Sequence, residues 1–150
     1  MRYAVALHVL GAVVWVGGMF FAYMVLRPSV GPLDVAVRLA LWREALGRFF
    51  VWVWICVAVM LGSGFAMWFI AFGSAMLAPT YARLMMTLGI VMAAIFVYVY
   101  FGPWSDFRRA LSRGDPTGAG KCLREIRVLV AVNLILGVLT VIVGASGPYS

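Results

Sequence analysis

The sequence predicts an all-α integral membrane protein, a bundle of four transmembrane helices, and three observations carry this prediction. Hydrophobic residues make up 65% of the chain and charged residues 11%, whereas soluble domains are about half apolar and about a quarter charged. Four stretches without any charge are each long enough for the roughly 20 helical residues that cross a bilayer core. The sequence lacks the strict alternation of polar and apolar residues that would indicate an outer-membrane barrel.

The uncharged stretches place the spans at about residues 3–26, 49–72, 84–104 and 128–147. An arginine directly precedes each stretch, because a guanidinium is costly inside lipid. Divided among four spans, the 150 residues leave room for one transmembrane domain, residues 1–150.

The basic residues are distributed unevenly between the connections. Ten of the twelve Lys and Arg residues lie between the first and second spans or between the third and fourth. Because cytoplasmic loops carry an excess of Lys and Arg, these two connections are predicted to be cytoplasmic. Both termini and the short 73–83 connection are then periplasmic, and the chain is expected in a bacterial inner membrane. The cations border apolar runs and form no basic stripe, which argues against nucleic-acid binding.

The two charged connections also contain signals of local structure. Residues 34–48 mix apolar side chains with arginines and predict a short interfacial helix that leads into the second span. Residues 113–118 read Arg-Gly-Asp-Pro-Thr-Gly and predict a turn. Residues 119–127 are expected to begin the last helix before it enters lipid.

A single histidine, His8, lies inside the first uncharged run. An ionisable side chain within a membrane span is costly and marks a functional site by default. On a helix, His8 shares a face with Gly11, Trp15 and Gly18, where small residues let another helix or a flat ligand approach closely. Helix packing alone is the simpler interpretation of the glycines.

The depth of His8 indicates which residues on other helices are level with it. At about 1.5 Å per residue, His8 lies roughly 8 Å below the outer boundary of its span. The same depth in the second and third spans falls near Met67, Met86 and Thr87, in the outer leaflet. Deeper methionines, such as Met60, are not expected to contact His8.

Imidazole with thioether ligands suits Cu(I), and an imidazole with or without a thioether also suits haem iron. The metal-site hypothesis therefore consists of His8, Met67 and Met86. The alternative is a b-type haem with His8 as axial ligand and with Gly11, Trp15 and Gly18 beside the macrocycle. Against both stands the use of methionine as a flexible apolar side chain that fills gaps.

Several short motifs follow one another along the chain: Leu7-His8, Trp15-Val16-Gly17-Gly18, Arg27-Pro28, Arg48-Phe49, Ser63-Gly64, Met92, Gly102-Pro103, and Arg127 followed by Asn133 to Gly137. Their order and spacing resemble the CopD family of copper-resistance membrane proteins. The resemblance implies an inner-membrane protein associated with copper uptake or tolerance, with His8 as the candidate ligand. The first span is also similar to HemJ, a membrane protoporphyrinogen oxidase that uses an intramembrane histidine and a lysine. The only lysine here, Lys121, lies instead in a charged loop.

Three functions follow from these observations: an inner-membrane copper-handling protein for uptake, tolerance or delivery, a haem-binding redox protein, and an accessory subunit of a larger membrane complex. Beyond the lipid bilayer, the partners they call for are a periplasmic copper carrier, a second copy of the chain or another membrane subunit. All five acidic residues lie in the charged connections, and no nucleophile with a base or phosphate-binding glycine loop is present. Hydrolytic and phosphoryl-transfer enzymes are therefore disfavoured.

Overall fold

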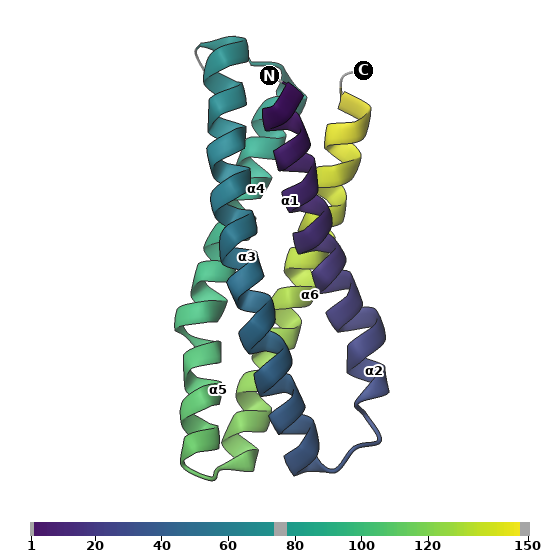
Figure 1. The fold of residues 1–150 in the computed structure, drawn as a ribbon, viewed down its shortest axis with the longest axis vertical. Helices are drawn as coiled ribbons and strands as arrows, with labels where there is room; N and C mark the ends of the chain where they lie inside the picture. Colours follow the sequence, from purple (N-terminus) through teal and green to yellow (C-terminus); the bar gives the residue numbers. More distant parts are fainter. Residues whose placement is uncertain (1, 74–77, 148–150) are drawn as a thin grey trace.

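The computed structural model describes residues 2–73 and 78–147, and this part of the chain is helical and contains no strand. Its four long helical stretches are Arg2–Ser29, Val35–Phe72, Thr80–Ser112 and Pro116–Ser146, and each is apolar enough to cross a membrane. They run up and down as one bundle (Figure 1). The predicted all-α membrane bundle of four helices is therefore confirmed. Part of the 73–83 connection lies outside the described residues.

The first stretch contains α1 (Arg2–Phe20), the π-helix η1 (Phe21–Leu26) and α2 (Arg27–Ser29). The change of helix type precedes Pro28, which has no N–H and whose ring clashes with the carbonyl four residues back in an α-helix. The N–H of Arg27 bonds instead to the carbonyl of Ala22, five residues back. The wider turn accommodates the proline without ending the helix.

The second stretch is a single helix, α3 (Val35–Phe72), of 38 residues. The separate interfacial helix predicted at residues 34–48 is therefore wrong, because this segment continues along the axis of the second span. Buried residues recur at helical spacing through both parts: Leu39, Trp42, Leu46, Phe50, Val53 and Val57. This continuous apolar stripe packs into the bundle, so the segment does not lie flat on the membrane. Gly73, with φ +65°, ends the helix.

The third stretch breaks at Gly102 into α4 (Thr80–Phe101) and α5 (Pro103–Ser112). Pro103 supplies no N–H and disfavours the α conformation in the residue before it, which explains why the break falls there. Helix α5 continues beyond the predicted end of the span at residue 104. It carries charged residues and extends the bundle past its uncharged part.

The last helix, α6 (Pro116–Ser146), begins three residues earlier than residue 119, where its start was predicted. Gly114 has φ +69° and makes the turn that precedes it. Pro116 occupies the first turn, and the Asp115 carboxylate accepts a hydrogen bond of 2.8 Å from the N–H of Gly118. The predicted turn is thus shorter than residues 113–118, because the cap starts the helix within it.

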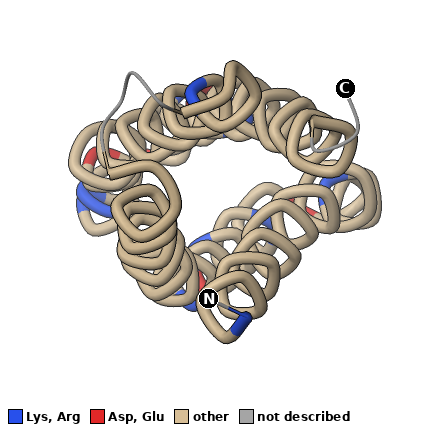
Figure 2. The backbone as a smooth tube through the Cα atoms, turned by 90° about the horizontal axis from the view of Figure 1, so that it is seen from above, with Lys and Arg blue, Asp and Glu red and all other residues tan. Residues whose placement is uncertain are grey.

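The bundle consists of two pairs, in which α1 packs mainly on α3, and α4 and α5 pack mainly on α6. Figure 2 shows the helices around a common axis, viewed from the end that holds both termini. We call this end the terminal end and the opposite one, with the α2–α3 and α5–α6 connections, the charged end. Large apolar side chains are exposed on the outer surface, where lipid covers them, including Leu10, Phe21, Val51, Ile55, Ile70 and Ile135.

Aromatic rings fill the middle of the bundle and join the two pairs. Phe50 of α3 lies edge-on to Phe96 of α4, with ring centroids 5.7 Å apart, and to Trp104 of α5 at 5.3 Å. Trp15 of α1 contacts Phe96 in the same manner at 6.4 Å. Edge-to-face pairs of this kind add about 0.5–1.5 kcal/mol each beyond the area they bury. Through these rings, α1 and α3 contact α4 and α5.

Candidate functional site

A cavity of about 230 Å³ lies between α1, α3 and α4 toward the terminal end, and α6 contributes Thr140 to its wall. His8 and Trp15 of α1 line it, together with residues of α3 and α4. Five methionines also line it: Met60, Met67, Met85, Met86 and Met92. The lining carries no Lys, Arg, Asp or Glu. The predicted metal residues His8, Met67 and Met86 therefore share one apolar cavity.

The imidazole of His8 is held by Ser63 of α3. Nδ1 of His8 lies 2.9 Å from the Ser63 hydroxyl oxygen. That hydroxyl donates its single proton to the backbone carbonyl of Val59, at 2.6 Å, four residues back on the same helix. The hydroxyl must therefore accept the bond from His8, whose Nδ1 donates.

This hydrogen bond determines which ring nitrogen is available for a ligand. A neutral imidazole with its proton on Nδ1 keeps a lone pair on Nε2. The ring's second hydrogen-bond partner among residues 2–73 and 78–147 is the backbone carbonyl of Met60, which as an acceptor shares the Nδ1 proton. Histidines that bind metals usually donate the other ring N–H to a second protein group in this way. Ser63 thus orients His8 and leaves one nitrogen free to coordinate.

The backbone beside the imidazole is that of a glycine. A Cβ built at Gly64 would lie 3.4 Å from Cε1 of His8, which is van der Waals contact. The ring of His8 therefore lies directly against this part of α3. Ser63 and Gly64 are therefore the residues of α3 that His8 contacts through its hydrogen bond and through its ring edge.

Three of the five methionines have packing partners that account for their positions. A Cβ at Gly11 would lie 2.9 Å from Met60 Cγ, and a Cβ at Gly144 would lie 2.8 Å from the Met85 methyl. The Met92 methyl lies over Gly137 in the same way, and the Met92 sulfur lies 3.9 Å from the Thr140 hydroxyl, which donates its proton to the carbonyl of Leu136 at 2.8 Å. These side chains fill the space left by glycines on neighbouring helices.

Met67 and Met86 differ from these three methionines. Both line the cavity, and neither covers a glycine among the residues that the structure describes. Packing on a neighbouring glycine therefore does not explain their positions. They are the same two thioethers that the depth of His8 indicates from the sequence.

The residues predicted to stand beside a haem lie in other surroundings. Gly11 faces Met60 of α3, and a Cβ at Gly18 would collide with the ring of Phe49, also on α3. Both glycines are thus at the α1–α3 contact, which agrees with the simpler packing interpretation. Trp15 is 3% exposed and lines the cavity. His8 and Trp15 therefore face the cavity, while the glycines bring α1 close to α3.

Some neighbours of His8 could not be found from depth alone. Ser63 lies about one turn below the level expected for a partner on α3, and Met60, expected too deep, also lines the cavity. Thr87, expected level with His8, is exposed and bonds to the carbonyl of Arg83. A serine inside an uncharged span was the available signal for a polar partner.

Within the described parts of the chain, no group of three or more His, Cys, Asp and Glu residues could hold a metal ion. A metal in the cavity would therefore depend on His8 and on thioethers. Cu(I) accepts such neutral, soft ligands, whereas harder cations prefer oxygen atoms. The donor set present thus fits Cu(I).

Comparison with known protein families identifies a match over most of the chain. The family model for Copper resistance protein D, CopD, matches residues 43–146. The chain belongs to the CopD family. This membership makes it a membrane protein related to copper resistance. No curated protein and no solved structure matches the chain.

The CopD match bears differently on the two sides of the cavity. Ser63, Gly64, Met67 and Met86 lie inside residues 43–146, so the α3 and α4 walls belong to the part that the family model describes. His8 lies outside that range. Its place in the site therefore rests on the cavity and on its bond to Ser63.

Proposed function

We propose that this CopD-family protein binds Cu(I) in the terminal-end cavity through His8, Met67 and Met86, and that it takes up, tolerates or delivers copper by this route. The observation that carries the proposal is the bond from His8 Nδ1 to Ser63, which leaves Nε2 available in a cavity lined by thioethers. All three ligands are uncharged, so the ion brings one positive charge and no anionic ligand needs burial in lipid.

The distribution of charge supports a direction for access. Ten of the twelve cations and all five acidic residues belong to the two connections at the charged end. By the positive-inside bias, this end faces the cytoplasm of an inner membrane and the cavity lies in the periplasmic half. A periplasmic copper carrier is then the donor that the arrangement calls for.

The size of the cavity favours an ion over a macrocycle. Its volume of about 230 Å³ is below the roughly 300–1,000 Å³ of pockets for drug-sized ligands. The faces of Gly11 and Gly18 are covered by side chains of α3, so they offer no open surface for a porphyrin. An absorption spectrum distinguishes the two: a Soret band in protein from haem-replete cells would contradict the copper proposal.

The methionine ligands are tested by a double variant, Met67→Leu with Met86→Leu. Leucine keeps the apolar volume and removes both sulfur atoms, so we expect Cu(I) affinity to fall on the order of tenfold or more. The measurement is competition for Cu(I) between the purified protein and a chromogenic Cu(I) chelator. The matched control, Met85→Leu with Met92→Leu, removes two thioethers of the same cavity and is expected to retain affinity. Equal losses in both double variants would contradict the choice of Met67 and Met86.

The role of Ser63 is tested by Ser63→Ala. Without its acceptor, Nδ1 of His8 no longer fixes the ring, and we expect Cu(I) affinity to fall about 10- to 100-fold, as for other outer groups that orient a metal-binding histidine. Ser63→Thr keeps the hydroxyl and should retain most of the affinity. Ser146→Ala removes a serine that bonds to a carbonyl four residues back in the same way but lies away from the cavity. An affinity in Ser63→Ala equal to that of Ser146→Ala would show that Ser63 does not support the site.

A further inference from the structure

A second cavity, of about 690 Å³, lies at the charged end, between the α2–α3 connection and the start of α6. Arg27, Gly31, Val35 and Leu39 line one side. The first three turns of α6 line the other, from Pro116 onward. Five basic side chains surround it: Arg27, Arg38, Lys121, Arg124 and Arg127. None of the five acidic residues of the chain lines it.

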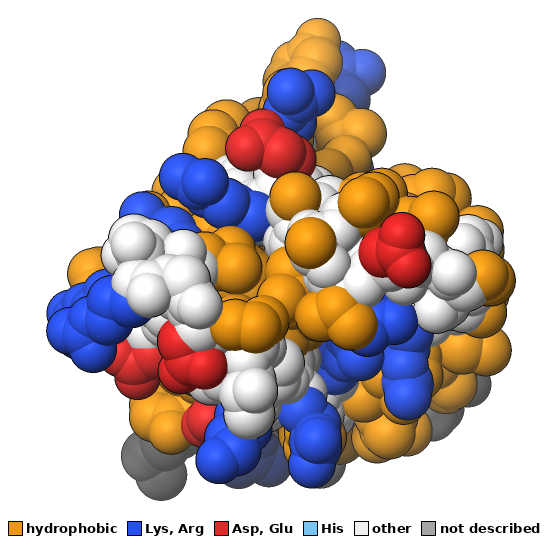
Figure 3. Space-filling model, turned by 90° about the horizontal axis from the view of Figure 1, so that it is seen from below, with side chains coloured by type: hydrophobic (Ala, Val, Ile, Leu, Met, Phe, Trp, Pro, Cys, Tyr) orange, Lys and Arg blue, Asp and Glu red, His pale blue; other side chains and the backbone are white. Residues whose placement is uncertain are grey.

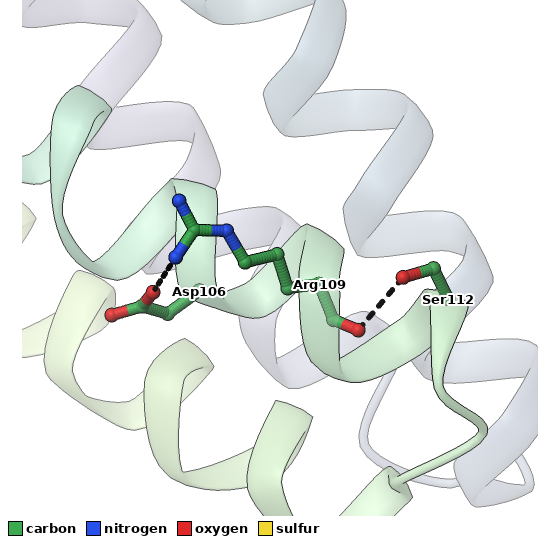
Figure 4. A network of polar contacts seen from close by, with 3 residues as sticks. All are labelled: Asp106, Arg109 and Ser112. Atoms are coloured by element: carbon green, nitrogen blue, oxygen red, sulfur yellow. Dashed lines mark hydrogen bonds and ion pairs between the residues drawn. The ribbon is translucent and has the colours of Figure 1, made fainter.

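The basic side chains of this cavity make no ion pair with the described part of the chain. Within the described residues the one ion pair joins Arg109 to Asp106 at 3.4 Å, on the separate helix α5 (Figure 4). Arg38 donates to the backbone carbonyls of Gly31 and Leu33, which are neutral. Five positive charges therefore face one volume without a carboxylate among its lining residues.

Arg127 is the most constrained of the five cations. Its guanidinium lies over the ring of Trp42, 5.3 Å from the centroid, and its Nε is buried with no hydrogen-bond partner in the described residues. The positive charges of Arg27 and Arg38 act on it. A buried, unpaired donor next to like charges is unfavourable, and an anion would relieve both costs.

The position of the cavity indicates the source of that anion. Arg27 directly follows the uncharged run of residues 3–26, and Arg127 directly precedes the run of residues 128–147. The cavity therefore lies at the boundary where phospholipid headgroups meet the hydrocarbon. Arg27 also lies over Tyr23, 4.9 Å from the ring centroid, and tyrosines and tryptophans are common at this boundary.

We infer that this cavity binds the phosphate of an anionic phospholipid headgroup, such as phosphatidylglycerol or cardiolipin. Basic pockets between membrane helices on the cytoplasmic side are suited to such headgroups. Figure 3 views the charged end and shows basic side chains gathered on this face, with acidic ones dispersed among them. This cavity shares no lining residue with the proposed copper cavity.

The test uses the purified full-length protein and native mass spectrometry during titration with phosphatidylglycerol, cardiolipin or phosphatidylcholine. Lys121→Gln with Arg124→Gln removes two exposed cavity cations that make no ion pair among the described residues. We expect binding of the anionic lipids to weaken on the order of tenfold. The control, Arg48→Gln with Arg113→Gln, removes the same charge from the same end outside the cavity and should bind as the wild type does.

The rescue variant, Lys121→Arg with Arg124→Lys, keeps both charges and is expected to restore binding, which shows that the loss does not come from misfolding. Equal weakening in both Gln double variants would overturn the inference, because it would mean attraction by net charge alone. Equal binding of phosphatidylcholine would also overturn it. Displacement of the lipid by millimolar inorganic phosphate would overturn the assignment to a lipid and indicate a free phosphate site.

Discussion

Replacing His8 with alanine is expected to lower the affinity for Cu(I) by on the order of a hundredfold or more. The variant removes the one imidazole that lines the cavity and leaves its thioethers in place. The measurement is the same chelator competition, together with the copper content of protein purified from copper-supplemented cells. An unchanged affinity would remove His8 from the site.

The His8→Ala protein is expected to fold, so its loss of binding is interpretable. The variant gives up one hydrogen bond between α1 and α3, and such bonds in membrane proteins average about 0.6 kcal/mol. A second variant, His8→Met, places a thioether at the same position. We expect it to recover part of the affinity, since Cu(I) accepts sulfur. Recovery to the same extent in His8→Leu would contradict coordination at position 8.

Replacing Gly18 with alanine is expected to destabilise the bundle by about 1–3 kcal/mol, because the new Cβ would collide with the ring of Phe49. Phe49 is partly buried and packs against Phe50, with ring centroids 6.2 Å apart, so its ring must shift to admit the methyl group. The measurement is the midpoint of thermal unfolding in detergent, monitored as the fraction of protein that remains monodisperse.

Gly17 supplies a control one residue away. A Cβ at Gly17 would meet nothing within 4 Å, so Gly17→Ala adds a methyl group on an open face. Alanine also favours helix over glycine by roughly 0.5–1 kcal/mol, and this variant should be as stable as the wild type or more so. If both substitutions changed the midpoint equally, the close approach of α1 to α3 at Gly18 would not contribute to stability.

Which residues of different helices lie at one level could be predicted, because bilayer depth is a property of each helix separately. Counting residues from the ends of the uncharged runs placed Met67 and Met86 level with His8, and all three line one cavity. The same counting missed Ser63, because helix rotation and tilt decide which side chain within a turn or so points at a neighbour. The expectation that Thr87 lies beside His8 was wrong for the same reason, because Thr87 has nearly the right depth but is exposed.

The membrane spans, the polarity of the two ends and the isolation of one imidazole within lipid were determined by the sequence itself, because hydropathy and charge act on each residue wherever its neighbours are. Only the tertiary structure decided that α1 pairs with α3, that Ser63 holds the ring, and that the cations around Arg127 surround one cavity. Those outcomes depend on which faces of the helices meet. Helices that are apolar on all sides carry little sequence information about their rotation in the bundle. Close packing at a few glycines therefore determines which faces meet.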